Sequence, residues 1–177
     1  ARLGSSVGIS IVREPEELQP AVDLAFEHDD KVLVEEFVDG VEVECSVLGN
    51  EDPIASAVGE IVTLSSEWYD YEAKYAEGGM DLVVPARIDE TTTARVQELA
   101  VRAFRACDCE GMARVDFFVR RSDGAVLVNE LNTIPGFTAT SVYAKLFAAS
   151  GLPYAELLDR LVELAIERHR RRRALRY

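Results

Sequence analysis

The sequence predicts an α+β fold in which an antiparallel sheet has helices packed on one side. Three observations favour it. Short runs of β-branched and aliphatic residues recur between residues 31 and 64, a strand–turn–strand pattern occupies residues 111–132, and helical periodicity returns at several points along the chain. With 177 residues, the protein can bury one sizeable core or two small ones.

The first third of the chain combines a loop, one helix and several strands. Residues 1–13 read as a glycine- and serine-containing loop, and residues 15–27 show apolar side chains at helical spacing. Because Pro20 falls inside this pattern, the helix is expected to kink or to start late. The predicted strands are residues 31–38, 41–49 and 53–64, with a turn at Asp39 and Gly40 between the first two.

The rest of the chain, from residue 65 onward, is predicted to contain an irregular segment, a short strand and several helices. Residues 65–80 are polar, aromatic and without a clear period, which is typical of either disorder or a functional lid. A short strand is expected at residues 82–87, and Asp89 is expected to cap a long helix. Further helices are predicted near residues 142–149 and from Pro153 onward. The terminal run Arg168–Arg173 reads as a solvated helix end.

The predicted hairpin carries a polar face that indicates a metal site. Alternation places Arg114 and Asp116 on one face of its first strand, and Glu130 and Asn132 on one face of its second. A three-residue turn at 122–124 would set Asp116 opposite Glu130 and Arg114 opposite Asn132. Facing carboxylates repel unless a cation lies between them, and oxygen donors of this kind suit magnesium. The alternative is a hairpin whose polar face only meets water.

Composition narrows the functional classes. A net charge of −13 and a pI near 4.6 argue against nucleic acid as the main partner. We expect neither a membrane span nor a signal peptide, because no long apolar run is present. The three cysteines, Cys45, Cys107 and Cys109, lack the spacing of a metal or redox motif, which favours a reducing compartment and hence the cytoplasm.

Four motifs lie in order along nearly the whole chain. They are Gly4-Ser5-Ser6-Val7-Gly8, Val34-Glu35-Glu36-Phe37-Val38 with Glu42, Trp68-Tyr69-Asp70-Tyr71-Glu72-Ala73-Lys74-Tyr75, and Arg114-Val115-Asp116 followed by Asn129-Glu130-Leu131-Asn132-Thr133-Ile134-Pro135-Gly136-Phe137-Thr138. Together they resemble the ATP-grasp portion of the D-alanine–D-alanine ligases. The third and fourth motifs are the selective ones, since a metal hairpin alone indicates only the wider ATP-grasp superfamily.

The resemblance implies an ATP-grasp fold with a nucleotide cleft between subdomains. Residues 1–38 would be the remainder of a central subdomain, and residues 39–177 would be the C-terminal subdomain. Members of the family also have an N-terminal domain in the same polypeptide, so we expect this chain to be a fragment of a larger enzyme. The resemblance further allows a homodimer.

The resemblance implies ATP as the nucleotide and assigns residues to it. Glu35 would lie near the adenine amine, the backbone of Glu36, Phe37 and Val38 would line the ring edge, and Glu42 would hold the ribose. Four further residues are implied around the phosphates and the base: Ser6 and Lys74 at the phosphates, Trp68 over the nucleotide and Phe118 beneath the base.

The implied reaction forms a dipeptide for peptidoglycan precursors. ATP phosphorylates the carboxylate of one D-alanine, and the amine of a second D-alanine attacks the acyl phosphate. Two Mg²⁺ ions, with Mn²⁺ as a substitute, would be held by Asp116, Glu130 and Asn132. The other implied contacts are Arg114 and the Gly136 amide at the oxyanion, Ser5 and Tyr75 at the first D-alanine, and Ser141 and Val142 at the second substrate.

Two alternatives remain open from the sequence. One is a ligase that makes D-alanyl-D-lactate or D-alanyl-D-serine, although Tyr75 and the intact motif around it look like the dipeptide form. The other is an isolated ATP-binding module without activity of its own.

Overall fold

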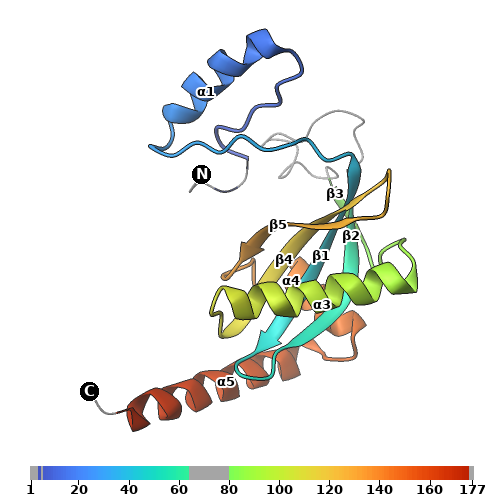
Figure 1. The fold of residues 1–177 in the computed structure, drawn as a ribbon. Helices are drawn as coiled ribbons and strands as arrows, with labels where there is room; N and C mark the ends of the chain where they lie inside the picture. The colour runs from blue at the N-terminus through green and yellow to red at the C-terminus, as the bar shows by residue number, and fades with distance from the viewer. Residues whose placement is uncertain (1–3, 5, 64–79, 176–177) are drawn as a thin grey trace. The chain divides into compact units, whose positions relative to one another are not determined.

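The computed structural model describes residues 4, 6–63 and 80–175 (Figure 1). The chain divides into two compact units, one formed by residues 1–37 with 63–81 and the other by residues 38–62 with 82–177. The boundary expected between residues 38 and 39 stays a prediction. The predicted lid at residues 65–80 lies almost entirely outside the described residues.

The described part of the first unit contains one helix. A 3-10 turn, η1 (Pro15–Glu17), leads into α1 (Leu18–Phe26). Pro20 is the third residue of α1, where its missing N–H would have no partner in the helix. The predicted late start of this helix is therefore confirmed. The Glu17 carboxylate accepts a hydrogen bond from the Arg13 amide at 2.8 Å and closes the turn.

The strand predicted at residues 31–38 is wrong. These residues form no strand, and the apolar side chains of Leu33, Val34 and Phe37 are 63%, 74% and 70% exposed. A run of aliphatic residues becomes a strand only when a neighbouring strand takes up its backbone hydrogen bonds. Within the described residues no neighbour pairs with this segment.

The second unit is built around a five-stranded sheet with the order β3-β2-β1-β4-β5. Its strands are β1 (Gly40–Gly49), β2 (Ile54–Thr63), β3 (Met80–Val83), β4 (Gly111–Arg120) and β5 (Val126–Asn132). β1 pairs antiparallel with β2 and β4, and β4 pairs antiparallel with β5. The antiparallel α+β class is thus confirmed. β3 ends at Val83, four residues before the predicted end at residue 87, and Pro85, which has no N–H, lies two residues after Val83.

Helices cover both faces of this sheet, which corrects the expectation of helices on one side (Figure 1). α3 (Glu90–Ala106) packs against one face through Val96, Ala100 and Phe104. α4 (Val142–Ala149) and α5 (Tyr154–Ala174) pack against one end of the other face. The second face is covered because it also carries an apolar side chain. Leu48 lies on the face opposite α3 and packs in the core formed with α4 and α5. Among the described helices, none has the length and apolar character needed to cross a bilayer.

The hairpin between β4 and β5 reaches the predicted register by an unexpected route. Val119 pairs with Val126, and the Arg120 amide donates to the Ala125 carbonyl, so four residues rather than three form the turn. Gly124 closes the turn in the left-handed conformation that favours glycine, with φ of 71°. A bulge in β5 at Asn129 then shifts the register by one residue. The bulge restores the pairing of Asp116 with Glu130 that the three-residue turn predicted.

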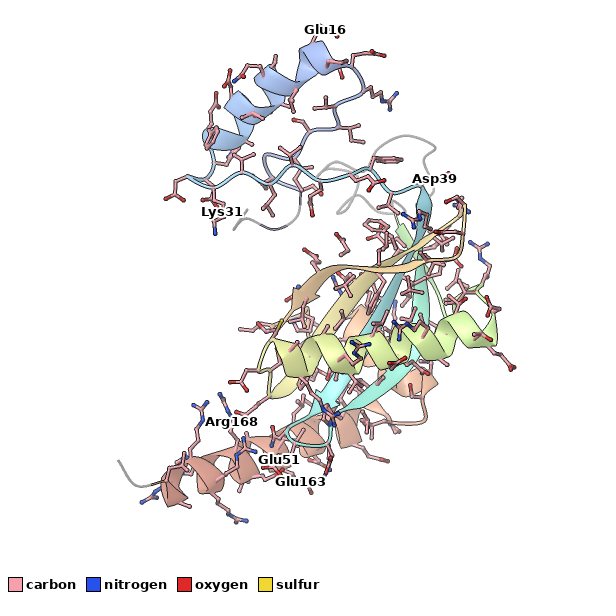
Figure 2. All side chains as sticks on the ribbon, viewed as in Figure 1. Glu16, Lys31, Asp39, Glu51, Glu163 and Arg168 are labelled. Atoms are coloured by element: carbon pink, nitrogen blue, oxygen red, sulfur yellow. The ribbon has the colours of Figure 1, made fainter. Side chains whose placement is uncertain are left out.

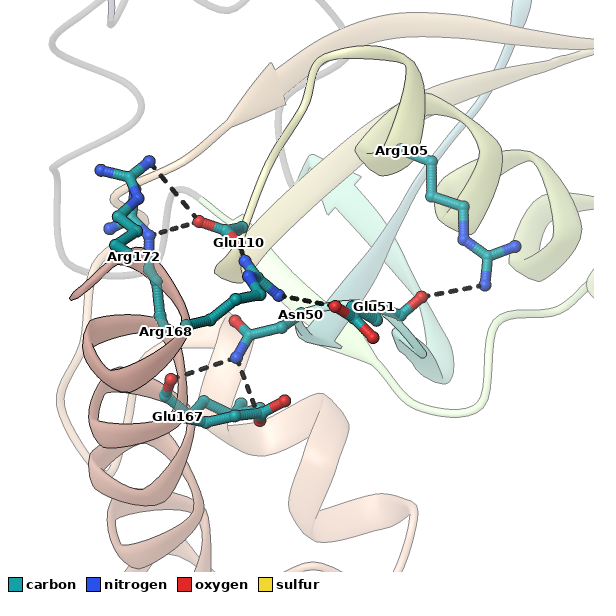
Figure 3. A network of polar contacts seen from close by, with 9 residues as sticks. Asn50, Glu51, Arg105, Glu110, Glu167, Arg168 and Arg172 are labelled. Carbon is teal, nitrogen blue, oxygen red and sulfur yellow. Dashed lines mark hydrogen bonds and ion pairs between the residues drawn. The ribbon is translucent and has the colours of Figure 1, made fainter. Parts of the chain in front are cut away.

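α5 is fixed to the sheet by an ionic network (Figure 3). Glu110, just before β4, pairs with Arg168, Arg171 and Arg172 of the helix. Arg171 also pairs with Glu51 at 3.1 Å; Figure 2 shows Glu51 in the turn after β1 and Arg168 on α5. The basic run is therefore only partly the solvated helix end that was expected, because three of its arginines meet carboxylates that lie far away in the sequence.

Candidate active site

Six of the predicted site residues lie on one face of the sheet, the face opposite α3, which we call the site face. Strand pairing arranges this face in rows across β1, β4 and β5. The rows are Glu42–Phe118–Leu127, Glu44–Asp116–Glu130 and Ser46–Arg114–Asn132. Paired residues on adjacent antiparallel strands have their Cβ atoms roughly 4.5–5.5 Å apart. The middle row therefore consists of three acidic residues on neighbouring strands, with one arginine in the next row.

Arg114 is clamped between two of these carboxyl groups. Its Nε and Nη2 donate to Oδ1 and Oδ2 of Asp116, both at 2.7 Å. The Nε atom also lies 3.2 Å from Oε2 of Glu44. Asp116 is only 3% exposed, so this two-point contact is largely shielded from solvent. A partly buried guanidinium held by two parallel hydrogen bonds has a fixed position and orientation.

Burial and neighbouring charges shift the acidity of this cluster. Burial, followed by the nearby charge of Asp116, raises the pKa of Glu44 to about 8. Burial alone would lower the pKa of Arg114, but its hydrogen bonds to Asp116 and the charge of Glu44 outweigh burial and raise it. The guanidinium therefore stays charged, and the site face keeps one fixed cation.

The oxygen donors on the site face fit a magnesium ion that shares its coordination with other ligands. Asp116 and Glu130 face each other, and Asn132 lies on the same side one row away. The Asn132 side-chain oxygen accepts a hydrogen bond from the Ile134 amide at 3.2 Å, which orients the amide group. In the described part of the chain, no three acidic, histidine or cysteine side chains gather closely enough to form a metal site. A magnesium ion here would thus need water or phosphate oxygens as well.

The loop after β5 leads to the residues predicted to bind the second substrate. Ser141 precedes α4, and Val142 is the first residue of that helix. The Ser141 hydroxyl accepts a hydrogen bond from the Thr138 amide at 3.0 Å and contacts the Thr138 hydroxyl at 2.9 Å. A Cβ at Gly136 would lie 3.4 Å from the Ser141 hydroxyl oxygen. Gly136, Ser141 and Val142 therefore belong to one tight loop.

Aromatic side chains of α4 and α5 pack against this loop. The Phe137 ring lies 5.8 Å from the Tyr143 ring and 5.6 Å from the Tyr154 ring, measured between centroids. The Tyr143 hydroxyl donates to the Val47 carbonyl of β1 at 2.9 Å. Two helices and the central strand thus fix the position of the loop, which gives the site face and the predicted substrate loop a common support.

The other predicted site residues belong to the first unit, begin the second unit, or lie outside the described residues. Glu35, Glu36, Phe37 and Ser6 belong to the first unit, and Val38 begins the second. Ser6 lies in a turn with φ of 59°, and the side chains of Glu35 and Glu36 are exposed. Four predicted site residues lie outside the described residues: Ser5, Trp68, Lys74 and Tyr75. Their assigned roles stay predictions.

Glu44 is the site-face residue that sequence reasoning missed. Its carboxyl is buried, lies opposite Asp116 and approaches Arg114. The signal was present in the strand predicted at residues 41–49, because Glu42 and Glu44 are two positions apart and must share a face. A second acidic residue beside one assigned to the ribose indicates that the polar face extends further along β1.

Comparisons with known proteins converge on one family. A family model described as "D-ala D-ala ligase C-terminus" matches residues 1–163. The D-alanine–D-alanine ligase of Acetivibrio thermocellus is 50% identical over 166 residues, which cover 94% of this chain and 44% of that protein. The chain spans about half the length of the curated relatives it matches.

Solved structures agree with the sequence matches. The D-alanine–D-alanine ligase of Coxiella burnetii superimposes with a TM-score of 0.85 at 43% identity, covering 97% of this chain and 45% of that one. The VanG D-Ala:D-Ser ligase of Enterococcus faecalis gives 0.81 at 46% identity, covering 91% and 46%. A Bacillus anthracis ligase complexed with ATP gives 0.76 at 29% identity, covering 92% and 52%.

Proposed function

Since the chain belongs to the D-alanine–D-alanine ligase family, we propose that it carries the metal- and nucleotide-binding part of an enzyme that joins two D-alanines at the expense of ATP. The observation that carries this proposal is the site face, where Asp116, Glu130 and Asn132 lie around the clamped Arg114. The product would serve peptidoglycan precursor synthesis in the cytoplasm. The ATP complex of the Bacillus anthracis relative supports the choice of nucleotide.

The carboxylates of the site face are proposed to hold magnesium. Bound by Asp116, Glu130 and Asn132, Mg²⁺ would offset the negative charge of the nucleotide phosphates. The donor set favours it over softer metals, because all three side chains offer hard oxygen atoms. Two facing carboxylates, one of them buried, also gain from a shared cation.

Arg114 is proposed to stabilise the charge that develops when the amine attacks the acyl phosphate. Its two hydrogen bonds to Asp116 hold the guanidinium in place before the reaction begins, so little reorganisation is needed. The Gly136 amide, in the loop that follows β5, is proposed as a second donor to the same oxygen. As the new amide bond forms, the bond between the acyl carbon and the phosphate oxygen breaks, inorganic phosphate departs, and the amine proton passes to the departing phosphate.

Four predicted site residues are proposed to bind the substrates. Ser141 and the Val142 backbone are proposed to bind the carboxylate of the second substrate at the start of α4, where helix amides favour negative charge. Ser5 and Tyr75 are proposed to position the first D-alanine. The nucleotide contacts are proposed to be Glu35, Glu36, Phe37, Val38 and Glu42 at the adenosine, and Ser6, Trp68, Lys74 and Phe118 around the phosphates and base.

A second candidate differs only in the nucleophile. The VanG relative is named a D-Ala:D-Ser ligase and is 46% identical to this chain. A D-alanyl-D-serine ligase would use the same metal, nucleotide and first substrate, so the site face fits both reactions. The predicted role of Tyr75 in the dipeptide form makes D-alanine the first choice for the second substrate.

The test uses the full-length protein that contains this chain. Purified enzyme is incubated with ATP, Mg²⁺ and D-alanine, alone or with D-serine or D-lactate, and phosphate and ligated product are measured separately. We expect D-alanyl-D-alanine as the main product and a requirement for Mg²⁺. Glu130→Gln should remove most activity, whereas the control Glu156→Gln, which neutralises an exposed carboxylate on α5, should retain it. Full activity in Glu130→Gln would contradict the metal assignment.

A further inference from the structure

We propose that Glu44 is a positioning residue that holds the Arg114 guanidinium when Asp116 is drawn to a metal ion. This inference rests on the proposed function, because it concerns the same metal site. It adds a residue and gives separate roles to the two buried carboxyl groups that contact the arginine.

Asp116 has two tasks on the site face. Both of its oxygens accept hydrogen bonds from Arg114 at 2.7 Å, and the same carboxylate is a proposed magnesium ligand opposite Glu130. A divalent cation at Asp116 repels the guanidinium and competes with it for the same oxygens. The arginine then needs another acceptor if it is to keep its position.

Glu44 is the acceptor that the geometry provides. Its Oε2 lies 3.2 Å from Nε of Arg114, yet the Nε hydrogen is already donated to Asp116. In the described residues this buried Oε2 atom has no hydrogen-bond donor. A buried acceptor without a donor is an unfavourable state that a small movement of the guanidinium would relieve. A carboxyl oxygen can accept this hydrogen bond whether Glu44 is ionised or neutral.

The sheet keeps Glu44 in place for this task. Glu44 and Asp116 are direct partners in the pairing of β1 and β4, so Arg114 reaches Glu44 diagonally across the same strand pair. Ser46 is the direct partner of Arg114, and its buried hydroxyl oxygen also has no hydrogen-bond partner among the described residues. Two buried polar groups on β1 thus flank the arginine on the side away from Glu130.

The test observes the arginine rather than the reaction. The full-length protein that contains this chain is labelled with ¹⁵N-arginine, and the Nε–H signal of Arg114 is identified by its loss in Arg114→Lys. Hydrogen exchange of this Nε–H is measured with and without Mg²⁺, and Mg²⁺ binding is followed separately by calorimetry. In the unaltered chain the Nε–H should remain protected in both conditions, because Asp116 holds it without metal and Glu44 holds it with metal.

Three variants isolate the role of Glu44. Glu44→Met removes the acceptor while keeping the length of the side chain, and with Mg²⁺ it should raise the exchange rate of the Arg114 Nε–H at least about tenfold. Glu44→Gln keeps an oxygen acceptor and should restore protection. Glu42→Met, two positions along the same strand and face, should leave protection unchanged. If Glu44→Met does not fold, Glu44→Ala is read in the same way.

The outcomes separate the two proposals. If Mg²⁺ binds and Glu44→Met keeps the protection of the unaltered chain, the role of Glu44 is overturned while the metal site stands. If calorimetry detects no Mg²⁺ binding to the unaltered chain, the proposed metal site fails, and the role of Glu44 falls with it. Faster exchange in both Glu44→Met and Glu42→Met would show a general charge effect and would also overturn the proposal.

Discussion

At the scale of single residues, the site face concentrates charge that is costly to bury. Glu44, Asp116 and Arg114 lie together with little exposure, and only one of them is cationic. The sequence predicted Asp116 and Arg114 on one face because alternation in a strand is a strict geometric rule. It did not predict how deeply they are buried, because burial depends on the helices that pack around them.

Glu44 should make stability depend on pH. Burial raises the pKa of its carboxyl to about 8, above its value in an unfolded chain. The folded state therefore favours the protonated form, and this stabilisation is present below about pH 4.5 and is lost as pH rises toward 8. Measured by urea denaturation, the free energy of unfolding should decrease by up to a few kcal/mol between pH 5 and pH 8. The Glu44→Gln variant should not show this decrease. If the unfolding free energy of Glu44→Gln changed with pH as steeply as that of the unaltered chain, other groups would be responsible for the pH dependence.

Arg114→Ala in the full-length protein should affect turnover more than nucleotide affinity. The guanidinium is proposed to act on charge that develops in the transition state, and loss of one such donor typically lowers the rate about 10²–10³-fold. Steady-state kinetics and separate measurement of ATP binding distinguish the two effects. Comparable losses in both would make Arg114 a phosphate ligand in the ground state.

At the scale of elements, β4, α3 and α4 match their predicted residues closely, whereas the segment at residues 31–38 does not. The matching elements have a clear sequence pattern, and each also packs against or pairs with another element of the chain. The Asp89 carboxylate, for example, accepts a hydrogen bond from the Thr92 amide at 2.9 Å, as expected of a helix cap. Residues 31–38 have the sequence pattern of a strand, but no described strand pairs with them. The hairpin shows a third case, in which the predicted turn length was wrong and a bulge corrected the register.

The Asp89 cap gives a direct stability prediction. Asp89→Ala removes the hydrogen bonds to the Thr92 amide and hydroxyl and should lower the unfolding free energy by about 1 kcal/mol. Thr91 is exposed and lies two residues after Asp89, so Thr91→Ala serves as the control and should change stability little. Chemical denaturation measures both variants. Because alanine raises helix propensity, a cost for Thr91→Ala as large as that for Asp89→Ala would show that the loss is not specific to the Asp89 cap.

The bulge at Asn129 predicts opposite effects for two single-residue deletions. Removing Asn129 leaves a regular ladder in which Glu130 still faces Asp116 and Asn132 still faces Arg114. Removing Leu131 instead turns Asn132 toward α3, on the side where Leu131 packs. We expect the first variant to keep its fold and Mg²⁺ affinity within about threefold, and the second to lose both. Circular dichroism and calorimetry compare them, and equal losses would contradict the register.

At the scale of the whole molecule, the second unit joins two cores through one sheet. One core lies under α3, and the other joins Leu48 to α4 and α5. The class, the antiparallel sheet and the ATP-grasp family were predictable from local patterns and motifs. The packing of α5 was not, because its apolar residues include Leu158 and Ile166, which are 40% and 45% exposed. Ionic contacts with Glu110, 58 residues before Arg168, help to set its orientation.

The Glu110 network should contribute to stability in a salt-dependent way. Glu110→Gln leaves Arg168, Arg171 and Arg172 without their shared carboxylate and should lower the unfolding free energy by about 1–2 kcal/mol at low ionic strength. The difference should shrink in 1 M salt because exposed charges are screened. Glu163→Gln, which removes a local pair with Arg160, is the control. A cost for Glu110→Gln that does not change with salt would indicate lost packing instead.

The bulge in β5 also bears on how sequences of this family are compared. One strand holds a residue that has no partner on the other, so a hairpin one residue shorter could present the same carboxylates and amide without moving them. An alignment gap placed at the turn and a gap placed at Asn129 would then describe the same site equally well. Differences in length between relatives at this hairpin consequently say little about their chemistry, and the identity of the residues facing Asp116 and Arg114 says much more.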